Sequence, residues 1–121
     1  MFDKMDKSLI YYLSHPCTTY GDAKQNRISS IMIENYLREM YKLHIINPIG
    51  LIPEGIDNDI AMEKCKHFYN GSDSIILCDN WEQSKGCNTE NRWAVEDRKP
   101  IYRLYWENKG LMDYSIELIS I

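Results

Sequence analysis

The chain has 121 residues, of which 44% are hydrophobic and 26% charged, the composition of a single globular domain. The formal net charge is −4 and the lysines and arginines are scattered, which argues against a nucleic acid polymer as partner. No stretch approaches the ~20 apolar residues of a membrane span and the N-terminus has no signal peptide pattern, so we expect a cytoplasmic protein without membrane contact.

The cysteines favour reduced thiols over disulfides. Cys17, Cys65, Cys78 and Cys87 include no CxxC pair, and a cytosolic location keeps thiols reduced. His15 with Cys17, and Cys65 with His67, lack the spacing of a zinc site. We therefore predict no metal and no cofactor.

The first half of the chain predicts two strands around one long helix. Residues 8–14 are apolar and aromatic throughout, as in a strand covered on both faces, and residues 15–21 form the loop after it. Asp22 or Asn26 can cap a helix of about five turns. Its apolar face consists of Ile28, Met32, Tyr36 and Met40, with Ile33, Leu37 and Tyr41 beside them. Residues 43–47 are the second strand, and residues 49–56, with Gly50, Pro53 and Gly55, are a loop that we expect to cover a site.

The second half predicts two more strands and two shorter helices. Residues 57–69 suit a helix with apolar positions at Ile60, Met62, Cys65 and Phe68, and residues 74–78 are the third strand. A polar loop, 79–88, leads to a helix from about 88 to 96 that Asn88 can cap, and residues 101–104 are the fourth strand. The tail, 105–121, is either a last strand or a helix, and its aromatic and apolar residues suit a subunit interface.

This order of elements predicts one α/β domain over residues 1–121. The expected architecture is doubly wound, with a mostly parallel four- to five-stranded sheet flanked by helices, of the flavodoxin or Rossmann-like kind. Loops 15–21, 48–57 and 79–88 then meet at the carboxyl edge of the sheet. Their meeting predicts a binding site at that edge.

The segment from Asp79 to Glu90 carries the strongest chemical signal. Backbone N–H groups at the start of its helix can hold an anion, and Ser84 and Lys85 add donors beside the turn at Gly86. Glu90, in the expected first turn, would be kept ionised by the helix dipole and is a candidate nucleophile. A capping carboxylate and a solvated surface turn remain alternative interpretations.

Four other polar or aromatic residues allow two roles each. Trp81 can stack on a nucleobase or close its loop, and His15 suits a turn better than a base. We expect Asn26 and Asn47 to fix loop backbone through their side-chain amides.

Three segments follow the order of motifs in a known superfamily. They are residues 10–16 (IYYLSHP) with Asn26, residues 44–48 (HIINP), and residues 72–90 (SDSIILCDNWEQSKGCNTE) with Ala94. Together they resemble the nucleoside 2-deoxyribosyltransferase-like superfamily, over about residues 8–104. They are most similar to its small bacterial and phage branch of unknown function, close to the 2′-deoxynucleoside 5′-phosphate N-hydrolases.

The resemblance implies a mechanism and assigns residues to it. Glu90 would attack C1′ of a ribose or deoxyribose and displace the base, and Tyr12 would hydrogen-bond that carboxylate. As in the monophosphate-hydrolysing relatives, Ser84 and neighbouring amides would hold a 5′-phosphate. Apart from the resemblance, we expect Lys85, Gly86, Asn88, His15 and Trp81 as further substrate-binding or phosphate-binding residues.

The sequence departs from the superfamily pattern at two positions. His15 stands where relatives have Gly. Where relatives carry an Asp that protonates the leaving base, this chain has Cys65 or Lys66, with Asp59 and Glu63 nearby. Loss of a general acid typically costs a factor of ~10²–10⁴ in rate.

These observations lead to one main hypothesis and two alternatives. The main one is an N-glycosidase that cleaves the base–sugar bond of a nucleoside or nucleoside 5′-monophosphate. The alternatives are a non-catalytic protein that binds a nucleotide or an ADP-ribose-type signal on the same fold, and an interaction module with a vestigial site. The expected partners are a nucleoside or nucleotide and other copies of the chain, in a homodimer or larger homo-oligomer.

Overall fold

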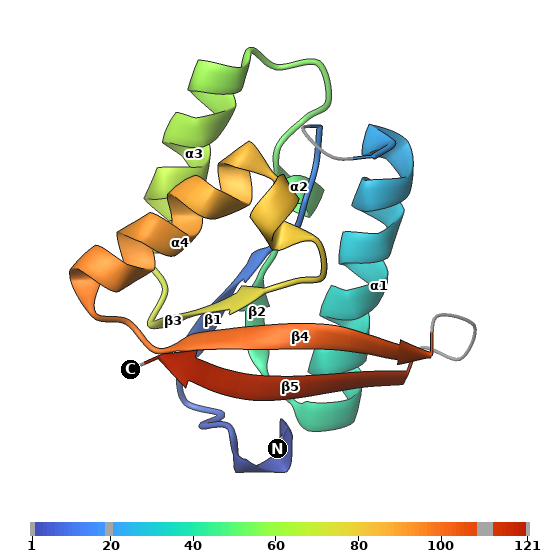
Figure 1. Cartoon of the computed structure of the whole chain (residues 1–121), viewed down its shortest axis with the longest axis vertical. Helices are drawn as coiled ribbons and strands as arrows, with labels where there is room; N and C mark the ends of the chain where they lie inside the picture. Colours follow the sequence, from blue (N-terminus) through green and yellow to red (C-terminus); the bar gives the residue numbers. More distant parts are fainter. Residues whose placement is uncertain (1, 19–20, 109–112, 121) are drawn as a thin grey trace.

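The computed structural model describes residues 2–18, 21–108 and 113–120, which form a five-stranded sheet with helices on both faces (Figure 1). The strand order is β2-β1-β3-β4-β5, with β1 to β4 parallel and β5 antiparallel to β4. The strands are β1 (Ile10–Ser14), β2 (His44–Ile46), β3 (Ser74–Leu77), β4 (Ile101–Asn108) and β5 (Asp113–Ser120). The predicted doubly wound, mostly parallel α/β fold is confirmed.

The helices cover the two faces unequally. Strand β2 lies on one side of β1, and β3, which follows β2 in the chain, lies on the other side of β1. Right-handed crossovers in these two directions put α1 on one face and α3 and α4 on the opposite face. The helices are η1 (Phe2–Lys4), α1 (Ala23–Tyr41), α2 (Pro48–Leu51), α3 (Asn58–Asn70), η2 (Trp81–Gln83) and α4 (Lys85–Asp97).

Strand β1 lies at the centre of both cores. Tyr11 and Leu13 pack in the cluster that contains Ile33 and Leu37 of α1, while Tyr12 packs in the opposite cluster. This alternation follows from the two-residue period of a strand. All three β1 side chains named here are 0% exposed, so the prediction of a strand covered on both faces is confirmed.

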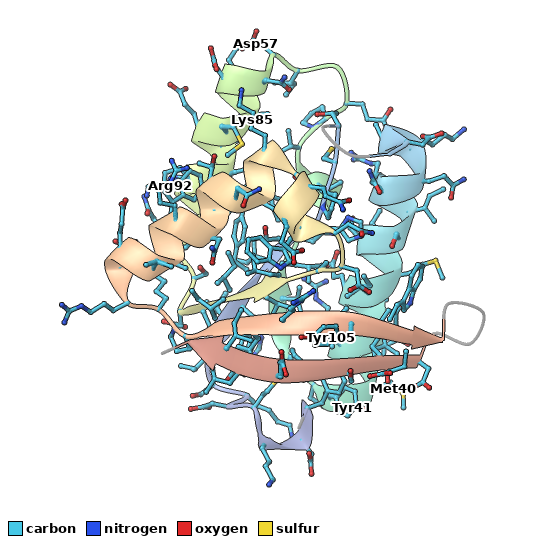
Figure 2. The ribbon with its side chains drawn as sticks, viewed as in Figure 1. Met40, Tyr41, Asp57, Lys85, Arg92 and Tyr105 are labelled. Atoms are coloured by element: carbon cyan, nitrogen blue, oxygen red, sulfur yellow. The ribbon has the colours of Figure 1, made fainter. Side chains whose placement is uncertain are left out.

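The buried face of helix α1 is rotated about the helix axis relative to the predicted apolar face. Asp22 caps it, accepting from the N–H groups of Lys24 and Gln25. Ile33 and Leu37 are buried as predicted, with Tyr36 and Tyr41 packed at the edge of their cluster. Ile28, Met32 and Met40 are exposed instead, because α1 turns the stripe through Ile33 and Leu37 toward the core. Met40 lies near the last turn of the helix (Figure 2).

Two predicted boundaries were wrong. Residues 49–51 of the predicted loop 49–56 belong to the short helix α2. That helix begins at Pro48, a first position where a missing N–H costs nothing. Helix α4 begins at Lys85 rather than near Asn88, and Ser84 is its cap, with Oγ accepting from the N–H of Cys87 at 3.3 Å. Helix α3 agrees with the predicted 57–69 within one residue at each end.

The tail forms a strand. Strand β4 extends beyond the predicted 101–104 to Asn108, and β5 returns beside it as the edge of the sheet, with Leu118 and Ile119 exposed. Residues 109–112 and 121 of the tail, and residues 19 and 20 of the loop 15–21, lie outside the described residues. In the part of the chain that is described, no helix combines the length and apolarity needed to cross a bilayer.

Candidate active site

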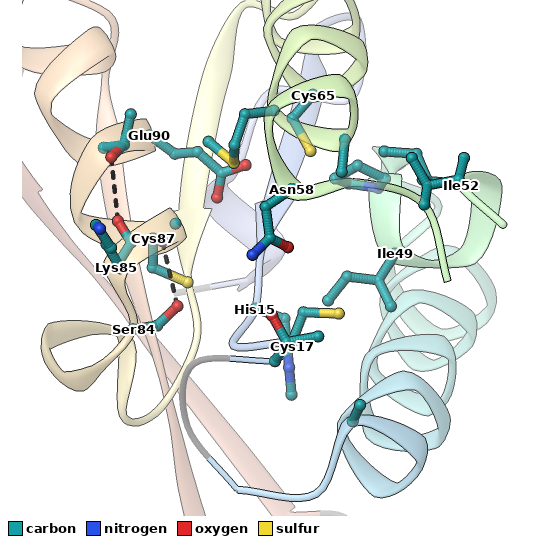
Figure 3. A pocket seen from close by; sticks show the side chains of 18 of the residues that line it. His15, Cys17, Ile49, Ile52, Asn58, Cys65, Ser84, Lys85, Cys87 and Glu90 are labelled. Carbon is teal, nitrogen blue, oxygen red and sulfur yellow. Dashed lines mark hydrogen bonds between the residues drawn. The ribbon is translucent and has the colours of Figure 1, made fainter. Parts of the chain in front are cut away.

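A cavity of about 540 Å³ opens at the carboxyl edge of the sheet, on the face covered by α3 and α4. It is lined by residues of the loop after β1, of α2 and the segment after it, and of the start of α4. The three loops that we expected to meet at this edge do so. The start of α3 closes the remaining side (Figure 3).

Glu90 lies at the inner end of this cavity and is 5% exposed. Its Oε2 accepts a hydrogen bond from the hydroxyl of Tyr12, and its Oε1 accepts one from Ser14 Oγ at 2.7 Å. Tyr12 and Ser14 are two residues apart on β1 and so point to the same face. The resemblance identified the Tyr12 contact. Sequence reasoning missed Ser14, although its two-residue spacing from Tyr12 was the available signal.

Burial controls the ionisation of Glu90. Desolvation raises the pKa of its carboxyl group to about 7, against the hydrogen bonds from Tyr12, Ser14 and Cys65, which favour the charged form. The expectation that the helix dipole keeps Glu90 ionised in a first turn was wrong. Since α4 begins at Lys85, Glu90 is its sixth residue, beyond the turn where the dipole acts.

Cys65 is the residue of α3 that faces Glu90. It lines the cavity, whereas the ammonium of Lys66 lies 4.5 Å from the centroid of the Trp93 ring and is not part of the lining. Burial raises the pKa of the Cys65 thiol to about 12, with Glu90 adding to the effect, so the thiol is neutral. Of the two nearby carboxyl groups, Asp59 lines the cavity and Glu63 does not.

Two further thiols line the cavity. Cys87 is buried, and its pKa is raised to about 12 by burial; Cys17 is half-buried, and burial raises its pKa as well. Among the described residues, no group of three His, Cys, Asp or Glu side chains is arranged to hold a metal ion.

The start of α4 supplies the predicted anion-binding elements. Ser84, Lys85 and Gly86 all line the cavity, and Lys85 projects near α3 at its outer end (Figure 2). Asn88 does not line it. The Asn88 side-chain amide instead donates to the carbonyls of Glu82 (2.8 Å) and Ser84 (2.9 Å), which fixes the turn before the helix.

Trp81 also lies outside the cavity lining. It packs at the edge of the core cluster that contains Tyr12 and Leu77. Of its two expected roles, the structure supports closure of the loop and not stacking on a ligand in this cavity.

His15 lines the cavity as a neutral turn residue. Its Nδ1 lies 2.7 Å from the carbonyl oxygen of Pro16, which can only accept, so Nδ1 carries the proton. Its Nε2 then accepts from Ser29 Oγ at 3.2 Å. Burial lowers the pKa of His15, and with both nitrogens engaged the ring is not a general base.

The two asparagines expected to be structural have different partners. Asn26 donates to the carbonyl of Cys17 at 2.9 Å, which confirms that it fixes the loop after β1. Asn47 donates to Ser30 Oγ and Glu34 Oε1, so it joins β2 to α1 rather than holding loop backbone.

Sequence reasoning missed the wall opposite Glu90. Ile49 and Ile52 form an apolar surface, and the side chain of Asn58 points into the space between them and α4 (Figure 3). Arg27 lies on the same side, with its guanidinium 3.2 Å from the carbonyl of Ile52 and 3.7 Å from Glu54. No local pattern marks these residues, because α1, α2 and α3 meet only in the folded chain.

Comparison with curated proteins and with solved structures finds no significant match to this sequence. One family model matches residues 9–103, which covers all the parallel strands except the end of β4. The family is described as a domain of unknown function, DUF4406, and the chain belongs to it.

Proposed function

We propose that this protein is an N-glycosidase that cleaves the base–sugar bond of a nucleoside or nucleoside 5′-monophosphate, with Glu90 as the nucleophile. The observation that carries the proposal is the position of Glu90. Its carboxylate ends a cavity of about 540 Å³ and is oriented by two hydroxyl groups from one strand. This volume lies within the range of about 300–1,000 Å³ that is typical of ligand pockets, and such a pocket can hold a nucleotide.

The two ends of the cavity suit the two ends of such a substrate. Ser84 and the backbone at the start of α4 can bind a 5′-phosphate, because a helix N-terminus favours an anion. Glu90 is one and a half turns further along the same helix, so a sugar held by its phosphate can present C1′ to the carboxylate. The resemblance to the nucleoside 2-deoxyribosyltransferase-like superfamily, which we propose as the wider relationship, supports the same roles.

The step we propose is displacement at C1′. A Glu90 oxygen attacks C1′, the bond from C1′ to the base nitrogen breaks with its electron pair on the base, and a sugar–Glu90 ester forms. Water then attacks C1′, releases Glu90 as a carboxylate and gives up a proton, which the released base takes up through solvent. The hydroxyl of Tyr12 holds the carboxylate in place and stabilises its charge when it leaves the ester.

A second candidate function is binding without turnover. The neutral thiol of Cys65 stands where relatives carry the carboxyl group that protonates the base, which favours a protein that binds a nucleotide or ADP-ribose-type signal. We also infer a cytoplasmic location, since the four cysteines are all free.

Chromatography of a panel of nucleosides and 5′-monophosphates separates these candidates. Under the first proposal the wild-type protein releases free base, and Glu90→Gln, which keeps the shape of the side chain, does not. Glu96→Gln is the matched control, because Glu96 is exposed on the same helix. Thermal stabilisation by a nucleotide without base release would favour the binding protein. If neither base release nor thermal stabilisation is observed, both candidates are contradicted.

A further inference from the structure

On the basis of the proposed glycosidase site, we infer that its substrates are N-glycosides whose base already carries a positive charge. N-ribosylpyridinium compounds and N7-alkylated purine nucleotides share this chemistry. Three features of the cavity support the inference: the proton donors in its lining, the charge of Glu90, and the composition of the wall opposite Glu90.

The first feature is the lack of a suitable general acid near Glu90 in the described lining. The thiols of Cys65 and Cys87 have pKa values raised to about 12 by burial, far from the neutral value that suits proton transfer. His15 is neutral, and its one ring proton is bonded to Pro16. Asp59 is exposed and lies six residues before Cys65 on α3, about 9 Å along the helix axis. A neutral base would therefore leave C1′ as an anion without a proton.

A cationic base does not need that proton. When the bond from C1′ to the ring nitrogen breaks, its electron pair cancels the positive charge of the ring. The base leaves as a neutral molecule, and Glu90 takes its place on C1′. Water then attacks C1′, Glu90 leaves as a carboxylate, and the proton of the water passes to solvent.

The second feature is the uncompensated charge of Glu90. Its hydrogen-bond partners are the hydroxyls of Tyr12 and Ser14, and the thiol of Cys65 is the third group that favours its ionised form. No ion pair found among the described residues involves Glu90. A buried carboxylate with only neutral partners gains most from a cation in the cavity. A cationic base on C1′ supplies that cation next to the nucleophile.

The third feature is the wall opposite Glu90. Ile49 and Ile52 present apolar surface, and Asn58 adds an amide that can bond to a ring substituent (Figure 3). Such a wall favours a departing neutral ring over a departing anion. In the described part of the chain, two cations line the cavity. Arg27 is paired with Glu54 and the carbonyl of Ile52, and Lys85 is exposed at the start of α4, the end of the cavity proposed for the phosphate.

Matched pairs of substrates test the inference. Guanosine 5′-monophosphate and its N7-methyl derivative differ by one methyl group and one charge. Nicotinamide mononucleotide and its reduced form differ in the charge of the ring. We expect kcat/KM for the cationic member of each pair to exceed that of the neutral member by ~10²–10⁴, the usual contribution of a general acid. The two pairs also distinguish a pyridinium from a purine substrate.

Binding provides a readout independent of turnover. At pH 8 nicotinamide mononucleotide, whose ring is cationic, should stabilise the wild-type protein against heat more than its reduced form does. Glu90→Gln should remove that difference, because it removes the negative charge and keeps the shape of the cavity. Glu96→Gln should retain it.

The outcomes separate this inference from the proposed function. Cleavage of neutral nucleotides at least as fast as cationic ones would overturn the inference and leave the glycosidase proposal standing. If Asp59→Asn loses the cleavage of neutral nucleotides, Asp59 is the general acid, and the inference is overturned because the site then has the proton donor that a neutral base needs. No cleavage, but Glu90-dependent preference for the cationic ligands, would support the ligand class and refute the glycosidase. If the protein shows neither cleavage nor a preference for cationic ligands, the inference is overturned.

Discussion

Replacing Glu90 with Gln should make the protein more stable at pH 8, although it should abolish the proposed activity. Glu90 is 5% exposed and has only neutral hydrogen-bond partners. Its negative charge is therefore held in the folded state against a desolvation cost. Gln has nearly the same shape, and the hydroxyls of Tyr12 and Ser14 can donate to its oxygen or accept from its amide.

The magnitude follows from the pKa of Glu90. A glutamate in the unfolded chain has an ordinary pKa of 4.5, and burial raises the pKa of Glu90 to about 7 in the folded protein. Between these values the folded state keeps a proton that the unfolded state has released, so stability falls as pH rises from 4.5 to 7 and is level above that. At 1.36 kcal/mol for each pKa unit, the free energy of unfolding decreases by about 3 kcal/mol across this range.

Urea denaturation between pH 4.5 and pH 8.5 measures this difference. The wild-type free energy of unfolding should fall by about 3 kcal/mol relative to Glu90→Gln, with most of the change below pH 7. Glu96→Gln, on the exposed side of the same helix, should follow the wild type within about 0.5 kcal/mol. If Glu90→Gln is the less stable protein at pH 8, the carboxylate stabilises the fold and the reasoning from desolvation is wrong.

Four further predictions test individual parts of the site. Tyr12→Phe removes a hydrogen bond that favours ionised Glu90, so the pKa of Glu90 should rise; the pH–rate profile of base release should then move to higher pH, and an unmoved profile would contradict this contact. Ser84→Ala removes the cap of α4 and should lower the free energy of unfolding by about 1 kcal/mol in urea, whereas Ser84→Asp, which can also cap, should lose less. Cys65→Asp adds a carboxyl group beside Glu90 and should raise the rate of neutral base release at least tenfold, while Cys65→Ser should not; the same chromatographic assay measures both. A homodimer through the exposed edge strand β5 should give twice the monomer mass in light scattering at tens of micromolar, and Leu118→Lys should return it to a monomer; a monomeric wild type would refute the assembly.

The fold could be predicted because its central strands β1 and β3 are covered on both faces. Residues 10–14 and 74–77 are short, continuous and mostly apolar runs, and each is followed by a polar segment where the strand ends. The apolar face of α1 was harder, because its apolar residues spread over more of the helix than the sheet can cover. Ile28, Met32 and Met40 fit the helical period and are still exposed, since the stripe through Ile33 and Leu37 is the one that packs in the core.

The site could be predicted where one segment carries it, and not where several segments meet. Glu90, Ser84 and Lys85 belong to one strand–loop–helix unit, and all three line the cavity. The wall formed by Ile49 and Asn58 depends on how α2 and α3 pack against α4, which no local pattern records. The short helix α2 was missed for a related reason, since Gly50 and Pro53 in residues 49–56 are typical of a loop.

The misplaced start of α4 had the largest chemical consequence. Asn88 and Ser84 are both good capping residues, and the 3-10 turn formed by residues 81–83 determines which of them ends the loop. Moving the start by one turn takes Glu90 away from the helix dipole and leaves its charge to burial and to neutral hydrogen-bond donors. A carboxylate that the fold kept ionised could act as a nucleophile whatever the charge of the substrate. Burial raises the pKa of Glu90 to about 7 and so favours the protonated form, and a cationic ligand that binds beside the carboxyl group favours the ionised nucleophile. For this reason the preference for a charged base and the pH dependence of stability test the same property of Glu90.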